Sequence, residues 1–524
     1  MWKGVGIFME SGKTKVLSVI AIVTFLVLIF SATFAYFQAQ GGSPTSANLS
    51  ATTYTTDVFT FATGDAITIN ADQDSFASGK GNPTSSSYAS AKLTANNKTN
   101  TATEHYYLYL NISDNTFTYS IDENTPEIIM TITDNNGTEI TNISTLNHVV
   151  VTGANGAQVS GYDITNTSGL ITLFNNREIT TTSSKEERWN ITVTFVNYDV
   201  SQNANAGKSM SAKVMIQKEA MPLHESCNDN TLACHVAKLY TGTQGANNIY
   251  YHDGALENGA VDNSYRYAGP SDTTNNFVCF GSSASTCPTD NLYRIIGVFG
   301  DQVKLIKYDY ATRDLLGNGT GSGVPIEPDY KGSLSIIDLY HWNNETGSNT
   351  WSESLLNKTN LNVNFITNIG TEWAQKIAMT TWKVGGNTWA HIGTQPAKTA
   401  YQNEIVSPVT TNTTDGKTEY SAKIGLMYVS DYGFAAAPST WTTKLSSYSN
   451  SSVTTVNWMY MGYNEWTISR DSNSDYAYQV SFGGEVYSEH FWKGFAVRPV
   501  FFLTSDVTYV SGDGSQNSPI RLSD

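Results

Sequence analysis

The feature that most constrains this chain is an uncharged, strongly apolar run at residues 16–37. As an α-helix the run would be about 33 Å long, enough to cross a hydrocarbon core of about 30 Å. Lys3, Lys13 and Lys15 precede it, and no Lys or Arg follows before Lys80. This asymmetry predicts a single-pass transmembrane helix with residues 1–37 forming a cytoplasmic tip and membrane segment, and with the rest of the chain outside the cell.

Two fates of this segment remain open, a retained anchor and a cleaved signal peptide. Thr33 and Ala35 place small residues at cleavage-like positions, whereas the apolar run is long for the core of a signal peptide. Residues 31–37, SATFAYF, resemble the end of the export signal in camelysin-like biofilm fibre proteins, in which cleavage near this point releases a β-sandwich subunit. The length favours retention in the cell membrane, and cleavage near Ala35 would make the protein secreted.

Composition points to β structure. Of the 524 residues 40% are hydrophobic and only 15% are charged. The chain contains 30 Tyr and 11 Trp, and aromatic side chains such as these favour the half-buried pleated surfaces of β-sheets. The length predicts two to four domains. The net charge is −16 and no Lys/Arg cluster is present, which argues against a nucleic-acid partner.

The four cysteines form two close pairs, Cys227 with Cys234 and Cys279 with Cys287. Their spacing fits no zinc motif, and outside the cell disulfides are stable. Four cysteines allow three connectivities, of which we expect the sequential one.

The exported part divides into two regions by pattern. After a polar linker at 38–50, alternating apolar and polar residues, for example from Tyr106 to Ile112 and from Trp189 to Phe195, predict an all-β, Ig-like sandwich over 51–218. This region again resembles the camelysin-like sandwich. A second linker is expected at 219–226.

The region 227–524 shows mixed signals. Residues 293–307 predict a β-hairpin with a turn at Gly300, residues 351–361 a short amphipathic helix, and residues 424–429 and 497–503 further strands. Short strands, few helices and long loops predict an α+β domain.

Four segments of this region support a resemblance. They are residues 291–298 (NLYRIIGV), 351–357 (WSESLLN), 465–470 (EWTISR) and 497–500 (VRPV). In this order they resemble a domain of uncharacterised surface proteins of gut Firmicutes, which is itself similar to the C-type-lectin-like and sulfatase-modifying-factor fold. The resemblance implies a lectin-like head with variable loops and does not imply a ligand.

Catalytic signals are missing from the sequence. Sulfatase-modifying-factor enzymes use cysteines in their catalytic centre, and no cysteine follows Cys287 here. The histidines form no spaced ligand motif, and no GxSxG is present. We therefore expect a protein that is not an enzyme.

Two weak binding signals stand out in the last region. Flat aromatic faces near polar groups suit carbohydrates, and they also fill cores; the candidates are Trp458, Tyr460, Tyr463, Trp466 and Trp492. Oxygen ligands alternate at Asp471, Asn473 and Asp475 as at the start of a calcium loop, but Tyr476 stands where an EF-hand needs glycine. No cofactor is expected apart from this calcium ion.

Three functions are compatible with these observations. The first is an adhesion or recognition protein in which a sandwich stalk displays a non-catalytic head that binds a glycan or a surface protein of a host or neighbouring cell. The second is a self-assembling subunit of an extracellular fibre or biofilm matrix. The third, a secreted hydrolase, lacks a visible nucleophile or carboxylate pair.

N-terminal sequencing of the native protein separates the first two functions. We expect an intact N-terminus in the membrane fraction, because residues 16–37 are long enough to span the bilayer. A new N-terminus close to Ala35 in a soluble or fibrous fraction would instead support the matrix subunit.

Overall fold

The computed structural model describes residues 57–71, 82–96, 100–143, 146–227, 229–319, 323–410, 417–449 and 451–523. The chain forms two compact units that divide between Ala220 and Met221, inside the expected linker at 219–226. The predicted membrane segment and the linker at 38–50 lie outside the described residues. Among the residues that are described, no helix is both long and apolar enough to cross a membrane.

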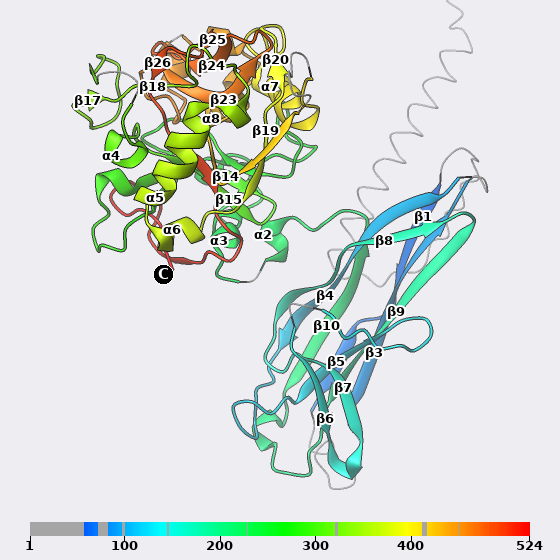
Figure 1. Ribbon diagram of the computed structural model, residues 1–524. Helices are drawn as coiled ribbons and strands as arrows, with labels where there is room; N and C mark the ends of the chain where they lie inside the picture. Colours follow the sequence, from blue (N-terminus) through cyan, green and yellow to red (C-terminus); the bar gives the residue numbers. More distant parts are fainter. Residues whose placement is uncertain are drawn as a thin grey trace, which may run out of the picture. The chain divides into compact units, whose positions relative to one another are not determined.

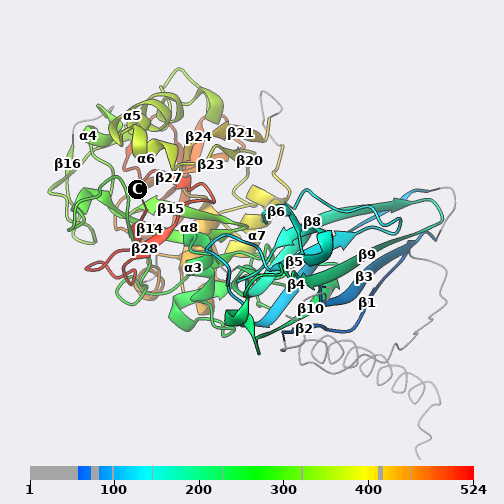
Figure 2. The same ribbon diagram turned by 90° about the horizontal axis from the view of Figure 1, so that it is seen from below.

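The N-terminal unit consists of two antiparallel sheets (Figure 1, Figure 2). A six-stranded sheet has the order β1-β3-β9-β5-β7-β6, and a four-stranded sheet has the order β2-β10-β4-β8. The strands are β1 Val58–Thr63, β2 Ile67–Asn70, β3 Thr84–Thr94, β4 Ala102–Asn115, β5 Ile128–Thr133, β6 His148–Thr152, β7 Gln158–Asp163, β8 Gly169–Thr181, β9 Ser184–Phe195 and β10 Ser209–Gln217.

Both sheets contribute to one hydrophobic core. Leu108 and Leu110 of β4 and Ile191 and Val193 of β9 are fully buried in the same cluster. Their neighbours Tyr107, Asn111, Asn190 and Thr192 are partly exposed, whereas Tyr109 is buried as well. The period of two in the sequence therefore predicted the buried faces of these strands, as expected for strands that cover a core on one side. The β-rich prediction for this region is confirmed, and its Ig-like character stays a prediction.

The C-terminal unit is built around a larger mixed arrangement. Its central sheet has the order β11-β12-β14-β15-β27-β22, with β13 added to β14, and a second sheet has the order β20-β23-β24-β25. The strands are β11 Ile249–Tyr251, β12 Tyr265–Tyr267, β13 Phe277–Cys279, β14 Leu292–Phe299, β15 Gln302–Lys307, β20 Gly386–Asn387, β22 Ile424–Gly425, β23 Glu465–Asp471, β24 Tyr476–Val480, β25 Val486–His490 and β27 Val500–Phe502. Two-stranded pairs are β16 Val324–Pro325 with β17 Ile336–Ile337, β18 Tyr340–His341 with β26 Gly494–Phe495, β19 Thr380–Lys383 with β21 Glu419–Ala422, and β28 Tyr509–Ser511 with β29 Arg521–Leu522.

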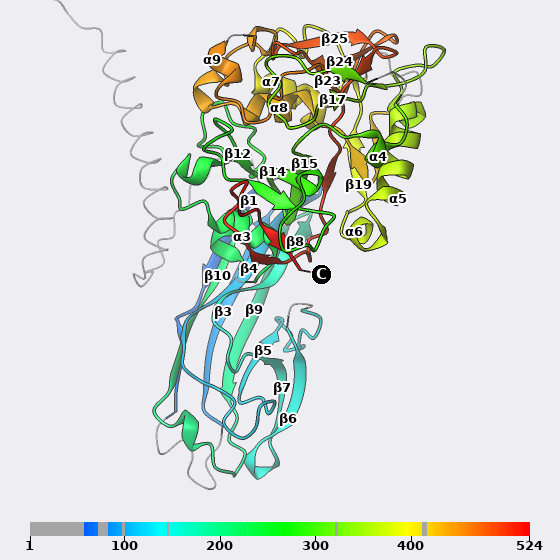
Figure 3. The same cartoon turned by 90° about the vertical axis from the view of Figure 1, so that its left-hand side faces the viewer.

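Short helices connect and cover these sheets (Figure 3). They are α2 Leu223–Ser226, α3 Leu232–Lys238, α4 Arg313–Leu316, α5 Ile366–Asn368, α6 Thr371–Gln375, α7 Ala397–Tyr401, α8 Val429–Ala435 and α9 Ser451–Thr454, with wider π-helical turns at Leu356–Phe365 and Gln402–Val406. The amphipathic helix expected at 351–361 is present as a 3₁₀ turn, Trp351–Glu353, followed by the first π-helical segment.

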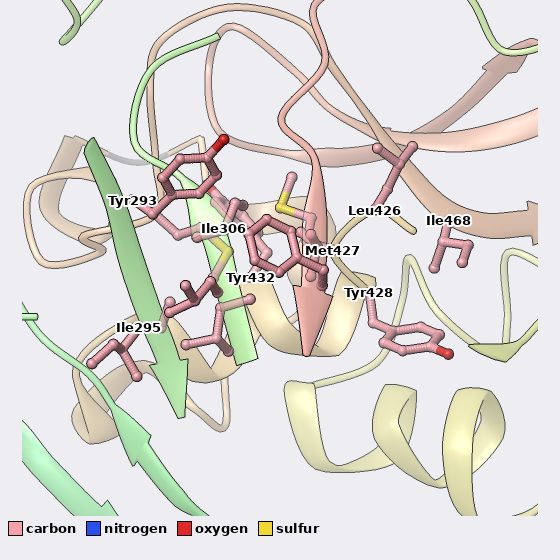
Figure 4. Packing of buried hydrophobic residues seen from close by; sticks show 14 of the residues in the cluster. Tyr293, Ile295, Ile306, Leu426, Met427, Tyr428, Tyr432 and Ile468 are labelled. Atoms are coloured by element: carbon pink, nitrogen blue, oxygen red, sulfur yellow. The ribbon is translucent and has the colours of Figure 1, made fainter. Parts of the chain in front are cut away.

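The core of this unit lies between the central sheet, α8 and the second sheet. Tyr293 of β14, Ile306 of β15, Met427, Tyr432 of α8 and Ile468 of β23 pack in one buried cluster (Figure 4). The predicted hairpin at 293–307 is confirmed as β14 and β15, with Gly300 at a positive φ of 62° in the turn. Both faces of this hairpin are covered, so it is a buried hairpin rather than a half-exposed one.

The prediction of a strand at 424–429 is wrong for the second half of this segment. β22 ends at Gly425, and α8 begins at Val429. The carboxylate of Asp431 accepts a hydrogen bond from the backbone N–H of Tyr428 at 2.9 Å, which satisfies an otherwise unpaired donor at the helix start. This local cap ends the extended segment. The last strand is also shorter than 497–503, because Pro499 has no N–H to donate to a ladder.

The four cysteines form two disulfides. Cys227 pairs with Cys234 and Cys279 with Cys287, which confirms the sequential connectivity. The first joins the start of the C-terminal unit to α3, and the second closes a loop between β13 and β14.

Each disulfide should add measurable stability to this unit. Replacing Cys279 and Cys287 by Ala should lower the free energy of unfolding by about 2.5 kcal/mol, because the open loop gains entropy in the unfolded chain. Denaturant unfolding of the double variant and of wild type measures the difference, and peptide mapping without reductant checks the pairing. An unchanged midpoint, or a peptide that joins Cys234 to Cys279, would contradict this account.

Candidate ligand-binding surface

The exposed aromatic side chains of the C-terminal unit lie on one sheet or on the loops next to its strands. In the part of the chain that the structure describes, three large aromatic side chains are exposed: Trp389 at 38%, Tyr487 at 39% and Phe482 at 57%. Tyr487 lies on β25, and Phe482 lies in the turn that joins β24 to β25. Trp389 follows β20, which belongs to the same sheet. Such clustering is informative because the other aromatic side chains of this unit are at least partly buried.

Trp389 and Tyr487 form a flat pair. Their ring centroids are 6.0 Å apart and their planes differ by 11°. Gly393 lies directly against the indole, since a Cβ at this position would come within 2.2–2.5 Å of three indole carbons. The glycine thus allows the tryptophan ring to lie on the backbone while it remains exposed to solvent.

The loop that carries Trp389 is held by its own hydrogen bonds. The backbone N–H of Thr394 donates to the carbonyl of Trp389 at 3.2 Å, and the Gln395 amide donates to the carbonyl of Ala390 at 2.8 Å. His391 closes the turn by accepting from the N–H of Thr388 at 3.2 Å. A ring presented on such a loop needs little further ordering when a ligand arrives.

Two carboxylates flank the aromatic pair. Tyr487 and Glu489 share one face of β25, and Glu485, in the turn directly before the strand, interacts with the Tyr487 hydroxyl. Among the described residues β25 pairs only with β24, so it is an edge strand of this sheet. Desolvation and the neighbouring Glu485 carboxylate raise the pKa of Tyr487, so its hydroxyl stays a hydrogen-bond donor at neutral pH. The surface therefore combines ring faces with both donors and acceptors.

The opposite face of β25 carries a second, more covered stack. His490 lies between Tyr476 and Trp492, with centroid distances of 4.3 and 4.2 Å. The backbone N–H of Phe491 donates to the carbonyl of Asp475, so this stack borders the 471–475 loop. Trp492, one of the predicted ligand residues, is therefore partly buried beside the predicted calcium loop.

The other predicted aromatic residues belong to the interior. Trp458 and Trp466 are buried, and their indole N–H groups donate to the backbone carbonyls of Tyr267 and Tyr340 at 2.8 and 2.9 Å. Tyr460 is also buried, and Tyr463 packs partly buried in a small satellite core. The prediction that these four residues form a binding surface is therefore corrected, because a ring covered by the protein offers no face to a ligand.

The 471–475 loop is organised around an amide. Asp471 accepts from the N–H of Asn473 at 2.8 Å, and Asn473 accepts from the N–H of Asp475 at 3.2 Å. The side-chain amide of Asn349 donates to three carbonyls, those of Asp471 and Asn473 at 2.8 Å each and that of Tyr476 at 2.7 Å.

The side-chain amide of Asn349 thus lies where these three carbonyl oxygens converge. A calcium ion would need six to eight oxygen ligands around it. No group of three or more His, Cys, Asp or Glu side chains in the described ranges is placed to hold a metal ion. The alternating oxygens of this loop form side-chain turns of the kind that Asp and Asn favour.

The structure also contains a small cavity lined by other residues. Its volume is about 10 Å³, and its lining includes Trp351, Val384, Tyr420 and Arg470. A space of this size holds about one water molecule, so it fits no organic ligand.

The sequence motifs and the exposed surface involve different residues. Arg294, Trp351, Trp466 and Arg498, which carry the resemblance, are all buried. Trp389 and Tyr487 fall outside every motif. The sequence contains only a weak signal for this surface: Tyr487 alternates with the acidic residues Glu485 and Glu489 directly after the Gly483-Gly484 turn.

Comparisons with known proteins found no match. No family model, curated protein or solved structure matches this chain.

The amide of Asn349 yields a direct prediction. Replacing Asn349 by Ala leaves three buried or partly buried carbonyls without this donor and should lower the free energy of unfolding by about 1–3 kcal/mol. Addition of calcium should leave the Tm of wild type unchanged. The exposed Asn344, replaced by Ala, is the matched control, for which we expect a change within about 0.5 kcal/mol. A calcium-dependent rise in Tm would contradict this view of the loop.

Proposed function

We propose that the C-terminal unit is a carbohydrate-binding head of a cell-surface recognition protein. The observation that carries this proposal is the exposed pair of Trp389 and Tyr487, parallel within 11° and flanked by two carboxylates. The apolar C–H faces of sugars stack on such rings, and their hydroxyl groups donate to carboxylates. The flat form of the surface suits an extended glycan better than a small molecule, which needs a concave pocket.

The carboxylates support binding rather than hydrolysis. Glu489 lies on β25 and Glu485 in the turn before it, four residues earlier, a spacing that corresponds to about 13 Å between their backbones where the chain is extended. Glycosidases place their two carboxyl groups about 5–9.5 Å apart across the scissile bond. We therefore propose that this surface holds a glycan without cleaving it.

The remaining parts of the proposal come from the sequence. The apolar run at 16–37 would anchor the protein in the cell membrane with its C-terminus outside, and the N-terminal unit would serve as a stalk. The mixed sheets and long loops of the C-terminal unit support a lectin-like scaffold in which loops carry the binding residues.

A fibre or matrix subunit is the second candidate. β6 and β1 are the edge strands of the six-stranded sheet, and each exposes a large apolar side chain, Val150 at 61% and Val58 at 50%. Open edges of this kind can pair with a strand of another copy. Assembly of purified protein into filaments would favour this function over the first.

Replacing Trp389 by Ala tests the binding function. Wild-type protein is first applied to an array of host-type and microbial glycans, and the Kd of the strongest positive is then measured for each variant. Removing the indole should raise the Kd by about two- to tenfold, since an aromatic contact is worth about 0.5–1.5 kcal/mol. Tyr487→Ala should weaken binding similarly.

Gly393→Ala provides a variant that leaves both rings in the sequence. The added methyl group would collide with the indole, so it should displace Trp389 and weaken binding with the fold intact. Ile336→Ala, at an exposed apolar residue of the same unit outside this surface, is the matched control and should bind as wild type. An array without positives, or equal affinities for W389A and wild type, would refute the proposal.

A further inference from the structure

Lys304 and Asp431 meet in the interior of the C-terminal unit. Lys304 lies on β15 and Asp431 in the first turn of α8, 127 residues apart in the sequence. The distance from Lys304 Nζ to Asp431 Oδ2 is 2.5 Å, and both side chains are only 3% exposed. An amine and a carboxyl group are thus held in contact at a site that bulk water does not reach.

The surroundings of this pair are largely aromatic. Lys304 Nζ lies 4.7 Å from the ring centroid of Tyr428, 5.5 Å from that of Phe502 and 5.6 Å from that of Phe299. Desolvation lowers the pKa of Lys304, although Asp431 opposes the shift. A buried amine of this kind loses its proton more easily than a solvated one, and the neutral amine is a nucleophile.

Two further groups, Glu404 and Arg266, interact electrostatically with this pair. Glu404 is buried, and its carboxylate accepts hydrogen bonds from the N–H groups of Val429 and Ser430 at 3.1 and 2.9 Å. Desolvation raises the pKa of Glu404, so it can take up and return a proton. On the other side, Arg266 Nη1 lies 3.7 Å from Asp431 Oδ1 and places a positive charge beside that oxygen.

We propose that Lys304 and Asp431 join spontaneously in an intramolecular isopeptide bond. The ammonium of Lys304 transfers a proton to the Asp431 carboxylate, and the neutral amine attacks Cγ. Arg266 stabilises the negative charge that develops on the carbonyl oxygen. Glu404 carries a proton from the attacking nitrogen to the departing hydroxyl, so the C–N bond forms, a C–O bond breaks and one water molecule leaves. No oxidant, reductant or cofactor takes part.

Such a bond would strengthen the unit in two ways. It replaces a buried pair of charges by a neutral amide, which removes a large desolvation penalty. It also joins β15 to α8 covalently across 127 residues of sequence, which restricts the unfolded chain far more than either disulfide does.

Mass spectrometry of the full-length, reduced protein tests the proposal. The wild-type chain should be lighter by about 18 Da, one water, than its amino-acid sequence requires, because amide formation expels water. A protease digest should contain a branched peptide with both Lys304 and Asp431. Measuring the loss on this peptide makes the result independent of any processing at the N-terminus.

Variants separate the bond from an ordinary ion pair. Lys304→Arg keeps the positive charge but has no reactive amine, so it should show the full sequence mass and a Tm lower by roughly 5–15 °C. Glu404→Gln should form the bond more slowly or not at all. Lys307→Arg is the matched control, since Lys307 is also buried on β15 but has no carboxylate within ion-pair distance among the described residues, and it should keep the loss of one water.

The result that overturns the proposal is equally direct. If the wild-type peptides that contain Lys304 and Asp431 are recovered separately and at full mass after prolonged incubation at neutral pH, the two residues form only an ion pair. Because this readout uses wild-type protein alone, it does not depend on whether any variant folds.

Discussion

A buried ion pair between Arg498 and Glu465 holds the two sheets of the C-terminal unit together. Arg498 precedes β27 of the central sheet, and Glu465 begins β23 of the second sheet. The guanidinium contacts both carboxylate oxygens, at 2.7 and 2.8 Å, and also donates to the carbonyl of Met459 at 2.7 Å. Removing one partner would leave an unpaired buried charge, an effect of about 3–5 kcal/mol. Because β24 and β25 are bonded to β23, the position of the exposed surface depends on this pair.

The division of aromatic residues between interior and surface follows from the same architecture. Most rings fill the space between sheets and helices, and buried indole N–H groups, such as that of Trp458, find backbone carbonyls as partners. Trp389 differs because it lies on a loop outside the sheets and rests on a glycine. A surface built from a rigid edge strand and an internally bonded loop is well suited to a ligand that must be held in one orientation.

Sequence patterns predicted some elements well, and the reasons are local. The alternation in β4 and β9 reflects strands with one buried face, and Gly300 marks the turn of the β14–β15 hairpin. The strand predicted at 424–429 is cut short because the Asp431 carboxylate caps the backbone N–H of Tyr428, so that a helix begins where the apolar pattern suggested a strand. The candidate site was predicted poorly. Trp458 and Trp466 lie in a segment that mixes polar and apolar residues, and only the sheets packed around them make them interior residues.

The sequence by itself determined the apolar N-terminal run, the β-rich character of the chain that follows it, the boundary near residue 220 and the pairing of neighbouring cysteines. Each of these depends on composition or on residues close together in the chain. The tertiary structure alone decided which aromatic rings are exposed, which carbonyls accept hydrogen bonds from the Asn349 amide and which charged side chains meet in the interior. Trp389 and Tyr487 are 98 positions apart, and Lys304 and Asp431 are 127 apart. Contacts over such separations arise from the packing of whole sheets, and no local pattern in the sequence encodes them.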